Sequence, residues 1–168
     1  MEEEKTLIEN IISLNRVVKV VTGGRRFRIS AWVAVGDGDG RVGIGHGKAA
    51  ETPDAIAKAL RRARKNMIKV PVINGTIPHP VVGKVSAAKI LLKPAGPGTG
   101  LIACHTVRAI LEAAGYKNVL TKSLGSSTPC NLARATIEAL KQLKDPREIS
   151  RKRGLPLTRV TRKFMLSS

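Results

Sequence analysis

The spacing of apolar residues changes period several times along the first half of the chain. A helical spacing over residues 5–13 predicts a short helix, and the β-branched segment Val17–Val21 predicts a strand. Gly23-Gly24 then predicts a turn. Apolar and polar residues alternate over 26–35, which predicts a second strand with one buried face. Trp32 falls on the polar side of this strand, where we favour packing beneath a helix over stacking on a base.

A glycine-rich strand and a longer helix follow. Residues 36–40 predict a hairpin turn, and alternate glycines over 41–48 predict a third strand with one face nearly bare. Thr52 and Pro53 are typical of the start of a helix, here predicted to reach about Lys69. Its apolar face holds Ile56, Leu60, Ala63 and Met67. The first half therefore reads α-β-β-β-α.

Proline and glycine interrupt any regular element after this helix, so we place a linker at 71–75 between a domain over 5–70 and a second domain over 76–145. The second half predicts a further α/β sandwich, which makes the fold class α+β. Its predicted elements are strands at Val81–Val82 and Ala87–Leu92, a helix over Cys104–Gly115, a strand over Val119–Leu124 and a helix over Thr128–Leu143. Residues 146–168 read as a basic tail ordered by RNA or docked on a protein.

Charge narrows the choice of partner. Lys and Arg number 30 against 12 Asp and Glu, a net charge of +18, and residues 1–75, 76–145 and 146–168 carry +6 each. An excess of positive charge spread along the chain is self-repulsive unless a polyanion neutralises it. This favours nucleic acid as the partner. No apolar run is long enough to span a bilayer, and the acidic start of the chain is unlike a signal peptide. We therefore expect a cytosolic protein without a membrane partner.

Basic residues also recur at helical spacing, opposite the apolar face of the helix predicted over 52–69. Such a stripe is often only a solvated surface, but here a basic turn at Arg25-Arg26 and the cationic tail accompany it, which favours RNA. DNA is a third alternative, for which the sequence offers no helix-turn-helix, zinc finger or basic zipper. The stripe consists of Lys58, Arg61, Arg62, Lys65 and Lys69.

Several catalytic and metal-binding patterns are incomplete. The segment ending at Gly47-Lys48 is not a nucleotide loop, because Val42 takes the place of the first glycine and Ala49 that of the magnesium-binding hydroxyl. Asp37 and Asp39 lack the further oxygen ligands of a calcium loop. The histidines are dispersed, and the two cysteines lack metal spacing, so we expect reduced thiols, no metal and no cofactor.

One glycine-rich segment keeps an enzyme reading open. Pro94–Leu101 precedes a predicted helix, where free N–H groups and the helix dipole could hold a phosphate. The same pattern occurs in small-molecule kinases, but the acidic residues nearby, Glu112, Glu138 and Asp145, fall in predicted helices or at a helix end. A plain turn is the third reading of this segment.

Ordered short motifs across residues 10–145 resemble the bacterial small-subunit ribosomal protein five family. In the first half these motifs are Asn15–Val17, Gly23–Arg25, Val35–Gly38, Gly40–Gly43, Gly47–Ala49 and Ala63–Ile68. In the second half they are Asn74–Pro80, Gly98–Ala103 and Asn131–Thr136.

This resemblance implies a first domain similar to double-stranded-RNA-binding domains and a second domain with a left-handed βαβ crossover. It also implies a non-catalytic role in the ribosome: binding small-subunit rRNA, contacting ribosomal proteins four and eight, and lining, with proteins three and four, the region where messenger RNA enters. Decoding accuracy would depend on the contact with protein four, and the chain would not form a homo-oligomer.

The resemblance and the charge pattern together give the candidate site residues. The hairpin from Arg16 to Arg28 would reach rRNA, with its glycine turn close to phosphates. Arg108 lies in the segment that resembles the family's contact with protein four. The candidate rRNA-binding residues are Arg16, Lys19, Gly23, Gly24, Arg25, Arg26, Arg28, Lys48, Arg61, Arg62 and Lys65.

Overall fold

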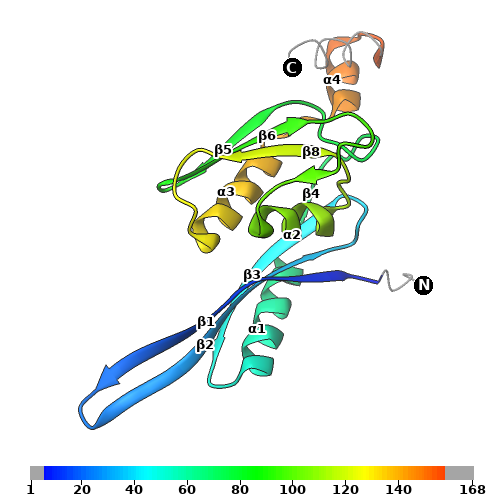
Figure 1. The fold of residues 1–168 in the computed structure, drawn as a ribbon. Coiled ribbons are helices and arrows are strands. Elements are labelled where there is room, and N and C mark those ends of the chain that lie inside the picture. The colour runs from blue at the N-terminus through cyan, green and yellow to red at the C-terminus, as the bar shows by residue number, and fades with distance from the viewer. Residues whose placement is uncertain (1–5, 158–168) are drawn as a thin grey trace.

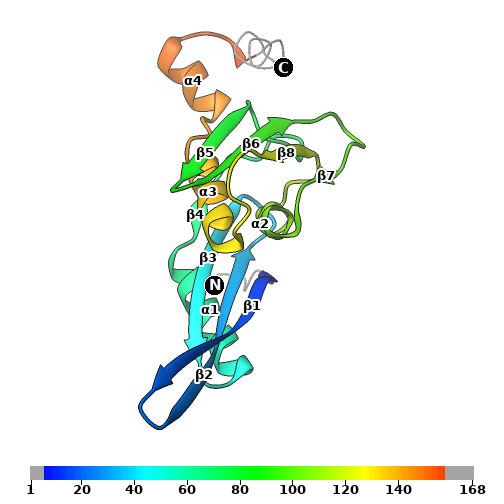
Figure 2. The ribbon, with the colours of Figure 1, turned by 60° about the vertical axis from the view of Figure 1, so that its left-hand side comes forward.

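The computed structural model describes residues 6–157, which form two four-stranded sheets and their covering helices (Figures 1 and 2). The first sheet has the order β1-β2-β3-β4, and the second has the order β5-β6-β8-β7. The first-half elements are β1 (Ile8–Val21), β2 (Gly24–Gly36), β3 (Arg41–Ala49), α1 (Thr52–Lys65) and β4 (Ile68–Lys69). The second-half elements are β5 (Val81–Val85), β6 (Ala88–Pro94), β7 (Leu101–Ile102), α2 (His105–Ala114), β8 (Val119–Ser123), α3 (Pro129–Lys141) and α4 (Pro146–Arg153). The α+β class is confirmed.

The helix predicted over residues 5–13 is wrong, because Ile8 onward already belongs to β1. β1 pairs with β2 antiparallel from Ile8 to Val21, and a bulge between Ile11 and Ser13 breaks the strict alternation expected of a strand. Pairing with β2 overrides the local helical spacing. The result is one long hairpin, whose far end projects beyond the rest of the molecule (Figure 1).

The bare face of β3 is confirmed and has a clear physical reason. A Cβ added to Gly43, Gly45 or Gly47 would lie 2.0–2.3 Å from a backbone carbonyl oxygen of α1. The partners on α1 are Ala63, Ala59 and Ala55, all fully buried. Glycine on the strand and alanine on the helix therefore bring the two backbones into direct contact.

The limits of α1 differ from the prediction at both ends. Glu51, not Thr52, is the N-cap residue, and the helix stops at Lys65 rather than Lys69. Ile68 and Lys69 instead form β4, which pairs with Val42 and Arg41 of β3. Lys69 therefore does not belong to the basic stripe on the helix, because its backbone pairs with β3.

The elements predicted in the second half are confirmed, with small shifts at their ends. Gly115 ends α2 with φ 90°, a left-handed conformation that suits glycine. The sequence did not indicate β7, which pairs parallel with β8. β7, α2 and β8 thus form a parallel βαβ unit, whose left-handed crossover stays a prediction.

The two sheets share one core. A large buried cluster joins Trp32, Ala34 and Val42 of the first sheet to residues of α2, α3 and the second sheet. Trp32 is 7% exposed, so its predicted core packing is confirmed. The single buried face predicted for 26–35 is wrong from Ala31 onward, because α1 covers one side of β2 and the second half covers the other. The linker placed at 71–75 stays a prediction.

Backbone hydrogen bonds fix this junction. The amides of Gly38 and Gly40 donate to the carbonyl oxygens of Ala113 and Ala114, both at 3.0 Å. These carbonyls lie at the C-terminal end of α2, where the last carbonyls of a helix have no hydrogen-bond donor within the helix. The turn between β2 and β3 therefore caps a helix of the other half.

The predicted basic tail begins with a helix. Asp145 is the N-cap of α4, where its side chain accepts a hydrogen bond from the amide of Arg147, and the helix ends at Gly154 in a left-handed conformation. The cationic segment 159–163 lies outside the described residues. In the part of the chain that the structure describes, no helix is long and apolar enough to cross a membrane.

Candidate RNA interface

Four cationic side chains surround a cavity of about 170 Å³ on the projecting hairpin. Lys19 and Arg26 are direct cross-strand partners, and Arg28 follows on the same face because strand side chains alternate. Lys48 joins them from β3, where it pairs with Ser30. The rest of the lining is Val17, Val18 and Val21, so no carboxylate lines the cavity. Its size and charge suit a phosphate group.

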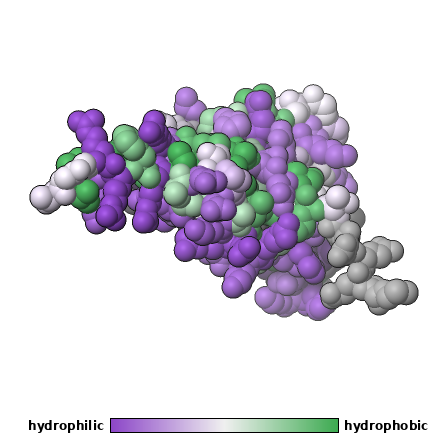
Figure 3. Space-filling model, turned by 90° about the horizontal axis from the view of Figure 1, so that it is seen from below, coloured by the Kyte–Doolittle hydropathy of each residue, from purple (hydrophilic) through white to green (hydrophobic). Residues whose placement is uncertain are grey.

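The opposite face of the hairpin is apolar and exposed. Val20 is 76% exposed and Phe27 45%. The guanidinium of Arg16 lies 4.0 Å from the centre of the Phe27 ring, and Arg25 stands opposite Val20. Figure 3 shows hydrophilic and hydrophobic side chains side by side on the projecting part. Arg16 and Arg25 are thus separated from the cationic cavity by the sheet itself.

The turn at the tip leaves its backbone open. Gly23 has φ 104°, a conformation that residues with a side chain rarely adopt, and a Cβ added to Gly23 or Gly24 would meet nothing within 4 Å. The predicted turn is confirmed, and its backbone is accessible to a partner.

The three candidate residues of α1 lie on its exposed side. Arg61 and Lys65 point away from the sheet, whereas Arg62 donates from its guanidinium to the carbonyl oxygen of His46 at 2.8 Å. Arg62 therefore ties α1 to β3 as well as carrying charge. In the described structure β3 pairs with β4 only at Arg41 and Val42. The rest of this edge has no neighbouring strand, and there the carbonyl oxygen of His46 accepts from Arg62.

His46 is the centre of a polar cluster at the junction. Its Nε2 lies 2.9 Å from Oγ of Ser30, and its ring stacks on Trp32 with centroids 4.9 Å apart. Burial lowers the pKa of His46, and the positive charges of Arg62, Arg134 and Lys48 lower it further. A neutral imidazole is therefore favoured, which suits a ring packed against an aromatic face.

Sequence reasoning did not single out Arg134, which the fold brings to this cluster. Its guanidinium carbon lies 5.2 Å from the centre of the Trp32 ring, so α3 of the second half contacts β2 of the first. No local pattern marks this contact, because the residues are far apart in the sequence.

The glycine-rich loop at 95–100 lacks the arrangement that the phosphate-cradle reading requires, one of the readings left open by the sequence. β7 separates it from α2, whose N-cap is Cys104. Three of its amides are already bonded: Ala95 to Oγ1 of Thr76, Thr99 to the carbonyl of Gly96, and Gly100 to Oδ1 of Asn118. The helix dipole and the free N–H groups on which the prediction depended do not coincide here.

Arg108 lies apart from the cationic hairpin, at the start of α2. Its guanidinium donates to the carbonyl oxygens of Leu101 and Ala103 at 3.4 and 3.2 Å. The side chain is exposed, yet it also holds the segment between β7 and α2 in place. A role toward a partner and a role in local order are both compatible with this position.

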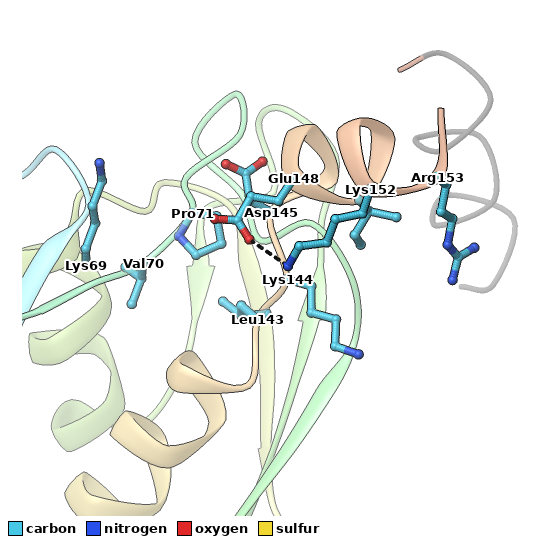
Figure 4. Close-up of a pocket in the computed structure, with 10 residues that line it drawn as sticks. Lys69, Val70, Pro71, Leu143, Lys144, Asp145, Glu148, Lys152 and Arg153 are labelled. Carbon is cyan, nitrogen blue, oxygen red and sulfur yellow. Dashed lines mark ion pairs between the residues drawn. The ribbon is translucent and has the colours of Figure 1, made fainter. Parts of the chain in front are cut away.

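A larger cavity of about 630 Å³ lies between α4 and residues 69–71 (Figure 4). Asp145 and Glu148 line it beside Lys69, Lys144, Lys152 and Arg153, and an ion pair joins Lys152 to Glu148 at 3.7 Å. This mixture of charges does not favour a polyanion. Among residues 6–157, no group of His, Cys, Asp and Glu side chains could hold a metal ion.

Comparison with known proteins agrees with this architecture. The family model for the N-terminal domain of ribosomal protein S5 matches residues 7–71, and that for the C-terminal domain matches residues 83–153. The small ribosomal subunit protein uS5 of Salinibacter ruber is 54% identical over 159 residues, which cover 95% of this chain and 91% of that protein. Members of this family are structural, non-enzymatic ribosomal proteins, which removes the kinase reading. The chain belongs to the ribosomal protein S5 family.

Proposed function

We propose that the β1–β2 hairpin binds folded small-subunit rRNA with both of its faces. The cationic cavity carries this proposal, because Lys19, Arg26 and Lys48 converge on a space that no carboxylate lines. Phosphate contacts supply sequence-independent affinity and set the orientation of a protein on RNA. The apolar face, with the Arg16–Phe27 pair, would pack on riboses or unstacked bases.

Candidate residues outside the hairpin extend this surface. Arg61 and Lys65 of α1 are exposed and add charge on the side of the sheet away from the cavity. The open backbone at Gly23 and Gly24 allows close approach of phosphates at the tip. We assign Arg62 a double role, because its bond to His46 positions α1 whether or not RNA is present.

Binding to in vitro transcribed small-subunit rRNA across a salt series tests this proposal. Lys19→Gln/Arg26→Gln should lower the slope of log affinity against log salt by about 2, since each lost phosphate contact removes roughly one unit. Arg61→Gln/Lys65→Gln tests α1 without disturbing Arg62. The control variant Lys117→Gln/Lys141→Gln removes two positive charges elsewhere on the protein. Its slope of log affinity against log salt should stay closer to that of wild type. Equal slopes for the hairpin variant and this control would contradict the proposal.

We further propose that the segment from β7 to α2 contacts ribosomal protein four and thereby supports decoding accuracy. Its motif resemblance and the exposed Arg108 support this. Arg108→Ala should weaken capture of purified protein four, while circular dichroism reports whether loss of the bonds to Leu101 and Ala103 has unfolded the segment. A folded variant with unchanged capture would oppose the assignment. Contacts with proteins three and eight, and with messenger RNA where it enters, belong to the same proposal and are testable by crosslinking in assembled subunits.

A further inference from the structure

The second sheet has one covered face and one open face. α2 and α3 lie on the same side of it (Figures 1 and 2), where Gly83, Ile90 and Val119 are buried. Side chains alternate along each strand, so the intervening residues point the other way. Among them Ile102 is 54% exposed and Leu124 51%. We call this open side the lysine face, which consists of Lys84, Lys89, Lys93 and Lys122 with Val82, Leu91, Ile102, Leu120 and Leu124.

The strand register orders these side chains into rows across the sheet. Lys84 pairs with Lys89, whose carbonyl accepts a hydrogen bond from the amide of Leu124 at 2.8 Å. The next row is Val82, Leu91 and Lys122, and the third is Lys93, Leu120 and Ile102. The lysines therefore surround an aliphatic centre.

This arrangement is unfavourable for the protein alone. Lys84 and Lys89 are directly opposite in register, and like charges in that relation destabilise a sheet. Lys122 is diagonal to Lys89 and Lys93, which places a third and a fourth charge nearby. None of the residues in β5, β6, β7 or β8 is acidic, so the strands themselves offer no counter-charge. An anionic partner would remove this repulsion.

We propose that the lysine face binds the sugar-phosphate backbone of RNA, as a second contact separate from the hairpin. The proposal rests on the proposed function, because it assumes the same class of partner. Lysine ammonium groups bind phosphates as point charges without reading sequence. The aliphatic centre would pack on the ribose rings between them. The face has no aromatic residue and no Arg, so base stacking and bidentate base recognition are not expected.

Composition favours RNA over an acidic protein as the occupant. Protein interfaces are enriched in aromatic residues, Met and Arg and depleted in Lys, whereas this face has the reverse composition. Its charge is complementary to a polyanion across all three rows. The clustering of four lysines without one neighbouring acid on the strands is the observation that decides between the two.

Salt-series binding of the full chain to small-subunit rRNA, combined with hydroxyl-radical protection of the RNA, tests the inference. Lys89→Gln/Lys122→Gln should lower the log–log salt slope by about 2 and remove a set of protected nucleotides. The charge-matched control is Lys117→Gln/Lys141→Gln. The tested double variant also relieves the pair of Lys84 with Lys89, so its thermal midpoint should stay unchanged or rise. Weaker binding at an unchanged midpoint cannot be assigned to unfolding.

The outcomes separate this inference from the proposed function. If the lysine-face variant fails to protect nucleotides that Lys19→Gln/Arg26→Gln still protects, the second contact is supported. If only the lysine-face variant loses binding, the inference stands and the role of the hairpin fails. A lysine-face variant with the slope and protection pattern of the control overturns the inference. Unchanged RNA binding with reduced incorporation into subunits also overturns it and assigns the face to a protein partner.

Discussion

Replacing Gly45 by Ala tests whether β3 and α1 are held together by direct backbone contact. The added Cβ would lie 2.0 Å from the carbonyl oxygen of Ala59 and 2.6 Å from the amide nitrogen of Ala63. Strand and helix would have to separate by roughly 1.5 Å to restore an ordinary separation of about 3.5 Å. Both contacted atoms belong to the backbone of α1, so no side-chain rotation can relieve the clash.

The expected cost follows from this geometry. Overpacking a core by a methyl group usually costs about 1–3 kcal/mol. Separation here would also loosen the contacts of Gly43 and Gly47 with the same helix, so we expect a loss near the upper end, about 3 kcal/mol. For a chain of this size that corresponds to a decrease of about 6–12 °C in the melting temperature.

Urea unfolding followed by circular dichroism measures this loss. Gly96→Ala is the matched control, because a Cβ there would meet nothing within 4 Å, and its stability should stay within about 0.5 kcal/mol of wild type. Adding Ala59→Gly to Gly45→Ala should not restore stability, since the clash involves the carbonyl oxygen rather than the alanine methyl. A loss below about 1 kcal/mol, or full rescue by that second change, would refute the proposed backbone contact.

Three further changes test other parts of the fold. Tyr116→Phe removes the hydrogen bond from the phenol to the carbonyl of Pro71 at 2.9 Å and should cost about 0.5–1.5 kcal/mol in urea unfolding. Gly115→Ala combines φ 90° with a Cβ 2.1 Å from the carbonyl oxygen of Gly38, so it should cost more than about 2 kcal/mol and reduce hydrogen-exchange protection in the 38–40 turn. The pKa of His46 is lowered from 6.5, so the unfolded chain gains the proton first and stability should fall as the pH drops below that value. His46→Gln should flatten this decline between about pH 7.5 and about pH 5.5, and an unchanged profile would contradict the assignment.

The sequence predicts most elements because their signals are local. Gly115 after an apolar helical run, Pro53 at a helix start and alternate glycines over 41–48 each have one dominant structural meaning. The helix predicted over 5–13 fails for the opposite reason. Its isoleucines have a helical spacing, but they pair with β2, and the bulge at Ile11 disguises the period of a strand. Tertiary pairing decides such ambiguous segments.

The candidate site shows the same division between local and long-range information. Lys19, Arg26 and Arg28 could be grouped from strand alternation around a predicted turn. Lys48 joins their cavity only because β3 pairs with β2 in one particular register. Arg134 reaches Trp32 through packing of one half of the chain on the other, a contact that no sequence spacing encodes.

The turn between β2 and β3 explains how separate basic surfaces can act together. Its sequence predicts only a polar hairpin, yet Gly38 and Gly40 donate to the last turn of α2, and Gly36 has no room for a Cβ beside the carbonyl of Ala113. The two halves are therefore joined by backbone bonds in addition to a shared apolar core. Recognition of folded RNA depends on shape, so charges gain affinity when their spacing is fixed before binding. Rigid attachment of the hairpin to the second sheet supplies that fixed spacing.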